Sequence, residues 1–245
     1  MNEQPTHLDL FSGIGGFALA AGWAGFRTIG FCEIEPYCQA VLKKHWPEVP
    51  VCSDIREMRG GGQRIDLLTG GFPCQPFSYC GKRRGKNDNR NLWPEMLRII
   101  KEQRPAWVIG ENVAGIINME LDQVHSDLES EGYSVQTLLI PACAVGAIHR
   151  RNRAWIIANN NNIGMERGGE AKIFGVKKIQ RNKNGGGFKE LCGMPPISTP
   201  RIFRACDGVP GWVDRLKGLG NAIVPQVAYQ IIKGIKEVME QSDEN

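Results

Sequence analysis

The stretch that decides the fold is HLDLFSGIGGF, residues 7–17. It begins as a short apolar strand over residues 7–11 and turns at once through closely spaced glycines. From Phe17 to Trp23 the pattern is that of a helix. A strand that passes through such a turn into a helix is the basic unit of a parallel sheet.

The same alternation continues along the chain. Further strands are predicted over residues 28–33, 65–68, 107–110, 135–140 and 154–158, and further helices over residues 36–45, 92–101 and 121–131. Repeated alternation predicts an α/β fold with a mainly parallel, doubly wound sheet covered by helices on both faces. Ligands of such sheets bind at the carboxyl ends of the strands.

Composition divides the 245 residues into three parts. Residues 1–158 carry the alternating elements. Four asparagines starting at Asn159 open a polar, glycine-rich stretch without apolar periodicity, which we interpret as a small irregular region over residues 159–205. Residues 206–245 contain an amphipathic helix over Ala222 to Met239, and Pro225 is tolerated near its start.

The overall composition excludes several classes of protein. No apolar run approaches the roughly 18 residues of a membrane span, and the N-terminus lacks a secretion signal, so a cytoplasmic location is expected. The eight cysteines form no CxxC pair, which argues against a disulfide framework and against a metal site. Basic residues cluster over 82–90 and 150–153. These clusters suit phosphate groups, although solvated loops would look the same.

The residues that follow the first strands suit a nucleoside. The glycines of residues 13–16 let the backbone approach a ligand closely. Glu33 follows the second strand about twenty residues later, where a carboxylate suits ribose hydroxyls. Asp54 could accept a hydrogen bond from an adenine amine. This pattern alone does not say which nucleoside binds.

The stretch GGFPCQPFS, residues 70–78, carries the reactive group. Cys74 lies between two prolines in a loop at the carboxyl end of a predicted strand. A thiolate is a nucleophile, and the basic residues from Lys82 onward would favour that form. The alternative is a buried structural cysteine.

Four motifs, in the same order, resemble those of the cytosine-5 DNA methyltransferases of bacteria and phages, which include the enzymes of restriction–modification. They are DLFSGIGGF at 9–17, FPCQ at 72–75, ENV at 111–113 and GNAI at 220–223. They cover most of the chain outside residues 159–199. The resemblance implies a Rossmann-like catalytic domain over residues 1–158, a short target-recognition region over 159–205, and a C-terminal segment over 206–245 that completes the catalytic domain.

The resemblance also implies the catalytic roles. Cys74 would add to carbon 6 of cytosine, which makes carbon 5 able to accept a methyl group. Glu111 would donate to ring nitrogen 3, which requires a raised pKa; a surface ion pair is the alternative role. Arg153 would hold the base oxygen, and Arg151 would support phosphate or the catalytic loop. His149 stands where the family usually has glutamine.

The implied methyl donor is S-adenosylmethionine, held by Phe11, Gly13, Ile14, Gly16, Glu33, Ile34, Asp54, Pro73, Leu92, Asn221 and Ala222. Ile14 and Ile34 could instead be core residues. The implied partner is double-stranded DNA, from which the target base is flipped. The family likeness predicts a monomer without metal.

Three other functions remain open on the sequence. A branch of the same family methylates transfer RNA, and the catalytic motifs do not exclude it. A DNA-binding protein that has lost catalysis is disfavoured because Cys74, Glu111, Arg151 and Arg153 are all present. A dinucleotide-dependent dehydrogenase is the weakest alternative, since FPCQ and ENV have no role in hydride transfer.

Overall fold

The computed structural model describes residues 4–73, 91–147, 150–160, 218 and 221–243. The strands are β1 (Thr6–Leu10), β2 (Arg27–Cys32), β3 (Val51–Cys52), β4 (Leu67–Gly70), β5 (Trp107–Val113), β6 (Tyr133–Pro141) and β7 (Asn152–Asn160). The helices are α1 (Gly16–Trp23), α2 (Pro36–His45), α3 (Trp93–Gln103), α4 (Leu121–Ser130) and α6 (Pro225–Asp243), with 3₁₀ turns η1 (Ala114–Asn118) and η2 (Ala142–Val145).

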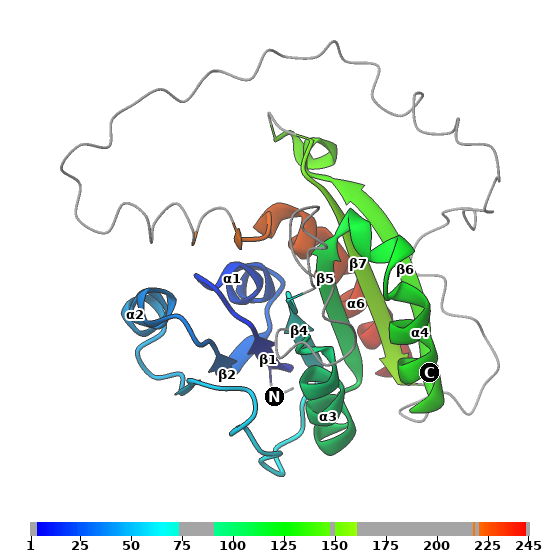
Figure 1. Ribbon diagram of the computed structural model, residues 1–245. Helices are drawn as coiled ribbons and strands as arrows, with labels where there is room; N and C mark the ends of the chain where they lie inside the picture. The colour runs from blue at the N-terminus through cyan, green and yellow to red at the C-terminus, as the bar shows by residue number, and fades with distance from the viewer. Residues whose placement is uncertain (1–3, 74–90, 148–149, 161–217, 219–220, 244–245) are drawn as a thin grey trace, which may run out of the picture.

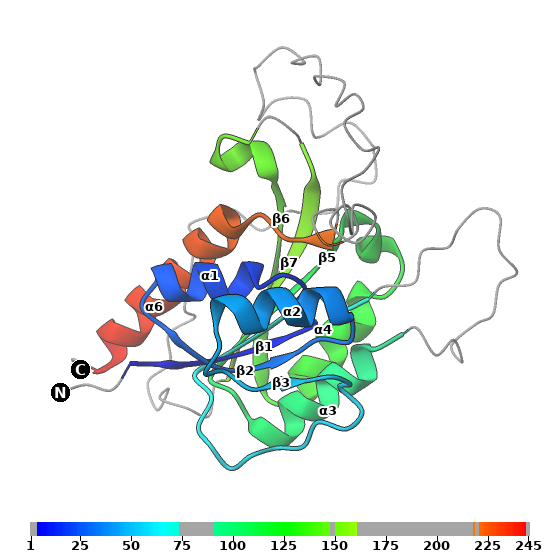
Figure 2. The same ribbon diagram turned by 90° about the vertical axis from the view of Figure 1, so that its left-hand side faces the viewer.

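The strands form one seven-stranded sheet in the order β3-β2-β1-β4-β5-β7-β6. β7 pairs antiparallel with both β5 and β6, while the pairs among β1 to β5 are parallel. Helices α1, α2 and α6 cover one face, and α3 and α4 cover the other (Figures 1 and 2). The predicted α/β fold with a mainly parallel, doubly wound sheet is therefore confirmed.

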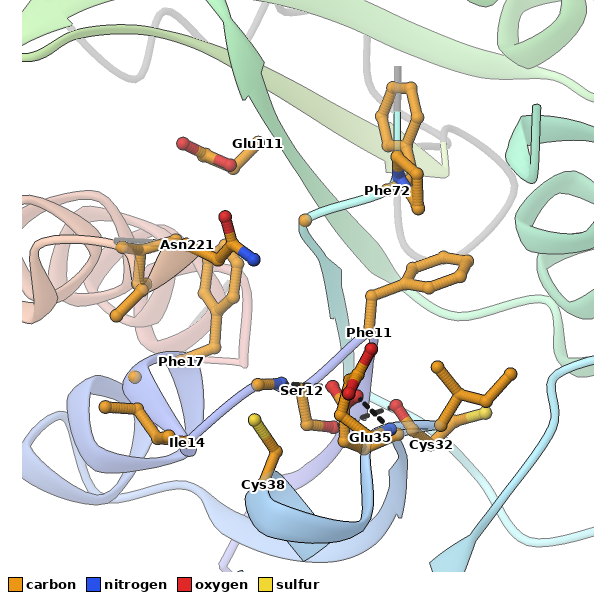
Figure 3. A pocket seen from close by; sticks show the side chains of 18 of the residues that line it. Phe11, Ser12, Ile14, Phe17, Cys32, Glu35, Cys38, Phe72, Glu111 and Asn221 are labelled. Carbon is orange, nitrogen blue, oxygen red and sulfur yellow. Dashed lines mark hydrogen bonds between the residues drawn. The ribbon is translucent and has the colours of Figure 1, made fainter. Parts of the chain in front are cut away.

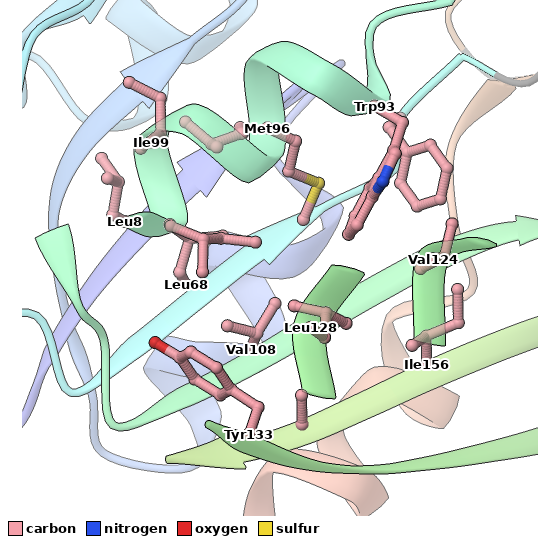
Figure 4. Close-up of a cluster of buried hydrophobic side chains, with 14 of the residues drawn as sticks. Leu8, Leu68, Trp93, Met96, Ile99, Val108, Val124, Leu128, Tyr133 and Ile156 are labelled. Carbon is pink, nitrogen blue, oxygen red and sulfur yellow. The ribbon is translucent and has the colours of Figure 1, made fainter. Parts of the chain in front are cut away.

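The apolar core consists of a separate cluster on each face of the sheet. Met96 and Ile99 of α3 and Leu128 of α4 pack with Leu68 and Val108 on one face (Figure 4). Alanines of α1 and the apolar side of α6 pack on the other face. Because both faces are covered, the central strands β4 and β5 are buried along nearly their whole length.

Most elements begin or end a few residues from the predicted positions, and three of the differences have a clear physical reason. β3 has only two residues, too few for a periodic pattern to indicate a strand. α6 begins at Pro225 rather than Ala222, because the first helical position is where proline costs no hydrogen bond. β7 continues to Asn160, which is buried, so the polar composition from Asn159 begins inside the strand.

The sheet order places a ligand site beside β1. Chain order runs outward from β1 through β2 to β3 on one side, and through β4 to β5 on the other. At such a switch point, the loops after neighbouring strands diverge and leave a crevice. No helix in the described ranges is long and apolar enough to span a bilayer.

A chain of buried polar side chains crosses the sheet beneath this crevice. Thr69 donates to Oδ1 of Asp9 at 2.7 Å, so the Thr69 oxygen accepts from Nε2 of His7 at 2.8 Å. Nδ1 of His7 then accepts from Thr28 at 2.9 Å. Burial lowers the pKa of His7 to about 3 and raises the pKa of Asp9 to about 8. Both groups are therefore neutral at neutral pH.

Asp9 leads to a prediction for stability. The unfolded chain ionises near the ordinary aspartate pKa of 3.8, whereas folded Asp9 keeps its proton up to about pH 8, so its contribution to stability falls as pH rises. Below pH 6.5, His7 becomes protonated in the unfolded chain but stays neutral in the folded protein. This difference makes stability rise with pH there and offsets the effect of Asp9. Between about pH 6.5 and 8, we expect the free energy of unfolding to fall by up to about 1.4 kcal/mol per pH unit.

The comparison is with Asp9→Asn, which has no proton to lose. Urea unfolding of both proteins at several pH values measures the difference between their slopes. Parallel stability curves would show that Asp9 does not titrate in this range.

Candidate active site

A cavity of about 450 Å³ opens at the carboxyl ends of β1 to β5, which is a usual size for a small-ligand site. Glu111 and Arg153 line it, and so does every residue predicted for the donor site. The latter are Phe11, Gly13, Ile14, Gly16, Glu33, Ile34, Asp54, Pro73, Leu92, Asn221 and Ala222. In Figure 3, Ile14 and Cys38 lie towards one end of this cavity and Glu111 towards the other.

The turn after β1 is shaped by Glu33. One carboxylate oxygen of Glu33 accepts from the backbone N–H of Gly13 at 2.6 Å, and the other accepts from the N–H of Glu35 at 2.8 Å. Gly13 has a φ of 54°, and Phe11 has a left-handed φ of 52°, which is unusual outside glycine. Glu33 thus joins the loops after β1 and β2, and it lines the cavity between them.

The loop after β3 supplies Asp54 to the same cavity. Oδ1 of Asp54 accepts from the backbone N–H of Arg56 at 3.0 Å, and Oδ2 lies 3.6 Å from the Arg56 guanidinium. Ile34 is 63% exposed although it is apolar. An exposed aliphatic side chain on the wall of a cavity is suited to covering the flat face of a ring. Its exposure excludes the alternative that Ile34 is a core residue.

The segment before α6 closes the cavity from the far end of the sequence. A Cβ placed on Gly16 would lie only 2.7 Å from Cγ1 of Ile223, so glycine is needed there for the two segments to approach. Arg151 donates to the carbonyl oxygen of Ala222 at 2.8 Å. Arg151 itself does not line the cavity. The structure therefore places it behind the cavity wall, where it holds Ala222.

Phe72 and Pro73 form the wall nearest the FPCQ motif. Nδ2 of Asn112 donates to the carbonyl oxygen of Phe72 at 2.9 Å, and the Phe72 ring packs on Trp93 with centroids 5.1 Å apart. The indole N–H of Trp93 donates to Asp127 of α4 at 2.8 Å. The backbone that leads into Cys74 is therefore held from β5 and from α3.

Glu111 and Arg153 face each other across β5 and β7. Nε of Arg153 lies 2.7 Å from Oε1 of Glu111. Burial raises the pKa of Glu111, and the charges of Arg153 and Arg151 oppose that shift in part. The other oxygen, Oε2, lies towards Gly71, where a Cβ would be 3.4 Å away. A carboxyl group whose pKa is raised thus lies beside Gly71, directly before the FPCQ motif.

Several predicted residues lie outside the described part of the chain. They are Cys74, His149, the basic residues of 82–90, and all of the expected recognition region 159–205 except Asn159 and Asn160. In the described ranges, no cluster of three or more histidine, cysteine or acidic side chains could hold a metal.

Sequence reasoning missed some of the residues that shape the site. Tyr37 and Cys38 line the cavity from α2, and Asn112 anchors Phe72. The predicted helix over residues 36–45 could have indicated the first two, since its first turn follows Glu33 directly.

This chain is similar in sequence to known DNA methyltransferases. The model of the C-5 cytosine-specific DNA methylase family matches residues 6–191. The type II methyltransferase M.NgoMIV of Neisseria gonorrhoeae is 37% identical over an alignment of 164 residues that covers 64% of this chain and 53% of that protein. M.PspPI of Psychrobacter is 40% identical over an alignment of 139 residues that covers 52% of this chain and 33% of that protein. The chain spans about half or less of the length of these relatives.

Solved structures of methyltransferases also resemble this chain in fold. A prophage-encoded DNA modification methyltransferase from E. coli superimposes with a TM-score of 0.58 at 25% identity, over 67% of this chain and 49% of that one. DNMT2 of Spodoptera frugiperda gives a TM-score of 0.56 at 25% identity, over 68% and 54%. From its sequence match and its sheet, the chain belongs to the C-5 cytosine-specific DNA methylase family.

Proposed function

We propose that this protein transfers a methyl group from S-adenosylmethionine to carbon 5 of cytosine in double-stranded DNA, with Cys74 as the nucleophile. The observation that carries the proposal is the single cavity lined both by the donor-site candidates and by Glu111 and Arg153. Methyl transfer needs the donor and the accepting base in contact, and one shared cavity allows this.

The chemistry of the cavity fits the proposed donor. Glu33 and Asp54 offer carboxylate oxygens for ribose hydroxyls and an adenine amine, and Phe11 and Ile34 offer apolar surface for the adenine ring. A carboxylate-lined cavity also favours a ligand that carries positive charge. When bound, S-adenosylmethionine supplies a methyl group on a positively charged sulfur. The residues of this chain bind and orient it.

Glu33 and Asp54 can be tested by donor affinity. Alanine at Asp54 should weaken binding of S-adenosylmethionine by roughly 1–3 kcal/mol, because a charged hydrogen bond is lost. Alanine at Glu33 should cost more, since Glu33 also holds the N–H groups of Gly13 and Glu35. Glu33→Gln should weaken binding too. The N–H groups of Gly13 and Glu35 donate to different oxygens of Glu33, and a glutamine amide has only one oxygen that can accept.

Calorimetry on folded variants measures these losses. Glu48→Ala is the matched control, since Glu48 is an exposed acidic residue that does not line the cavity. Unchanged affinity in Glu33→Ala or Asp54→Ala would remove that residue from the donor site.

The acceptor half of the cavity supports thiolate addition to cytosine. Attack by Cys74 at carbon 6 places negative charge on the ring, and a proton from Glu111 at nitrogen 3 would neutralise it. Arg153, whose Nε lies 2.7 Å from Oε1 of Glu111, would hold the base oxygen and orient the Glu111 carboxyl group. After methylation, loss of the carbon 5 proton, release of the Cys74 thiolate and return of the nitrogen 3 proton to Glu111 would restore the aromatic ring and the starting state of the site.

The substrate is tested by activity on two nucleic acids. With labelled methyl donor, we expect incorporation into duplex DNA and none into transfer RNA. Expression in a methylation-free bacterium, followed by bisulfite sequencing, then maps the methylated sites. Incorporation into transfer RNA alone would make this an RNA methyltransferase. Donor binding without transfer to either substrate would indicate a protein that has lost catalysis.

A further inference from the structure

Arg98 of α3 reaches across to the loop after β3. Its guanidinium donates to the carbonyl oxygen of Ile55 at 2.7 Å and to that of Met58 at 3.0 Å. The same guanidinium is held by Glu95 at 2.9 Å and by Glu102 at 2.8 Å. One side chain thus joins two carboxylates of its own helix to two backbone carbonyls of a separate loop.

That loop forms part of the candidate donor site. Asp54, Ile55 and Arg56 all line the cavity. The strand that precedes them has only two residues, so the sheet itself constrains the loop little. Glu102 adds one further tie, because its second oxygen accepts from the N–H of Gly60 at 2.9 Å. The contacts from α3 therefore span residues 55 to 60, directly after Asp54.

We propose that Arg98 is a positioning residue for donor binding, acting by fixing the loop that carries Asp54 into the cavity. This inference rests on the proposed function of the cavity. Arg98 does not line the cavity, so its effect passes through the loop.

The geometry requires arginine rather than any cation. Four acceptors surround the guanidinium, and arginine offers five N–H donors in a rigid plane. A lysine ammonium at the end of a flexible chain has three donors and cannot reach both carbonyls and both carboxylates at once. A purely electrostatic role would be retained by lysine, whereas a positioning role would not.

The test measures affinity for S-adenosylhomocysteine by calorimetry. We expect Arg98→Met and Arg98→Lys each to raise Kd about tenfold, with the maximal methylation rate at saturating donor nearly unchanged. Lys101→Met is the matched control: it lies one turn further along α3 and pairs with Glu131 at 2.9 Å. Its Kd should equal that of the wild type. If Arg98→Met does not fold, Arg98→Lys decides the question.

A double-mutant cycle with Asp54→Ala separates positioning from general destabilisation. If Arg98 acts through Asp54, Arg98→Lys should raise Kd much less in the Asp54→Ala background than in the wild type. Equal effects in both backgrounds would overturn the proposal, and so would wild-type affinity in Arg98→Lys. Failure of the wild-type protein to bind S-adenosylhomocysteine would instead overturn the donor site itself.

Discussion

Replacing Cys74 by serine should abolish methyl transfer and leave binding of S-adenosylmethionine nearly intact. A serine hydroxyl is a far weaker nucleophile than a thiolate at neutral pH, and losing the nucleophile of a covalent mechanism costs much more than a factor of about one hundred. Residual activity above about one hundredth of the wild-type rate would therefore exclude Cys74 as the nucleophile.

The structure supports a specific expectation for donor binding in this variant. Phe72 is held by Asn112 and Trp93 independently of the Cys74 side chain, so the adjoining cavity wall should persist. Cys143→Ser is the matched control, because Cys143 lies in η2 and does not line the cavity. It should retain activity.

DNA that carries 5-fluorocytosine provides a second measurement of the same role. Carbon 5 then has no proton to lose, so the bond between Cys74 and carbon 6 cannot be released after methyl transfer. Wild-type protein should form a covalent complex that survives denaturing electrophoresis, and Cys74→Ser should form none. A wild-type protein that methylates ordinary DNA yet traps nothing would argue against covalent catalysis.

Much of the fold could be predicted because its signals are local. The apolar run of residues 107–110 in β5 is buried on both faces of the sheet, so it is continuous in the sequence. The turn after β1 could be recognised from its glycines, because Gly13 and Gly15 adopt positive φ and Gly16 leaves room for Ile223. Among the candidate donor-site residues, Phe11, Glu33 and Asp54 closely follow β1, β2 and β3, so local signals indicated them, whereas the family likeness alone indicated Asn221 and Ala222.

The unpredicted features depend on contacts between distant parts of the chain. Asn112 lies 40 residues from the Phe72 carbonyl that it holds, and Arg98 lies 43 residues from Ile55. No periodicity encodes such pairs, because a side chain that donates to a distant backbone carbonyl leaves no pattern among the residues around it. His7 is similar: only its position between Thr28 and Thr69 in the folded sheet explains a fully buried histidine.

Replacing Glu111 by glutamine should lower the methylation rate at saturating donor and DNA by about one hundredfold or more. Glutamine keeps the shape and can donate an N–H, but it cannot transfer a proton to nitrogen 3, and general acid catalysis contributes about 10²–10⁴. Affinity for S-adenosylmethionine should change little, because the proposed donor contacts are Glu33 and Asp54 rather than Glu111. A variant that kept more than about one tenth of the rate would remove proton transfer from the role of Glu111.

The pH dependence of the rate gives a sharper test of Glu111. Burial raises its pKa, so the proton-carrying form persists to higher pH than in an ordinary glutamate, and the wild-type rate should fall on the basic side as that proton is lost. Arg153 opposes the shift from 2.7 Å, so removing its charge in Arg153→Gln should move this fall to higher pH. Glu111→Gln has no carboxyl proton, so the same fall should be absent from its profile. A basic limb that is identical in all three proteins would have to arise from another group, and Glu111 would then be a hydrogen-bonding residue only.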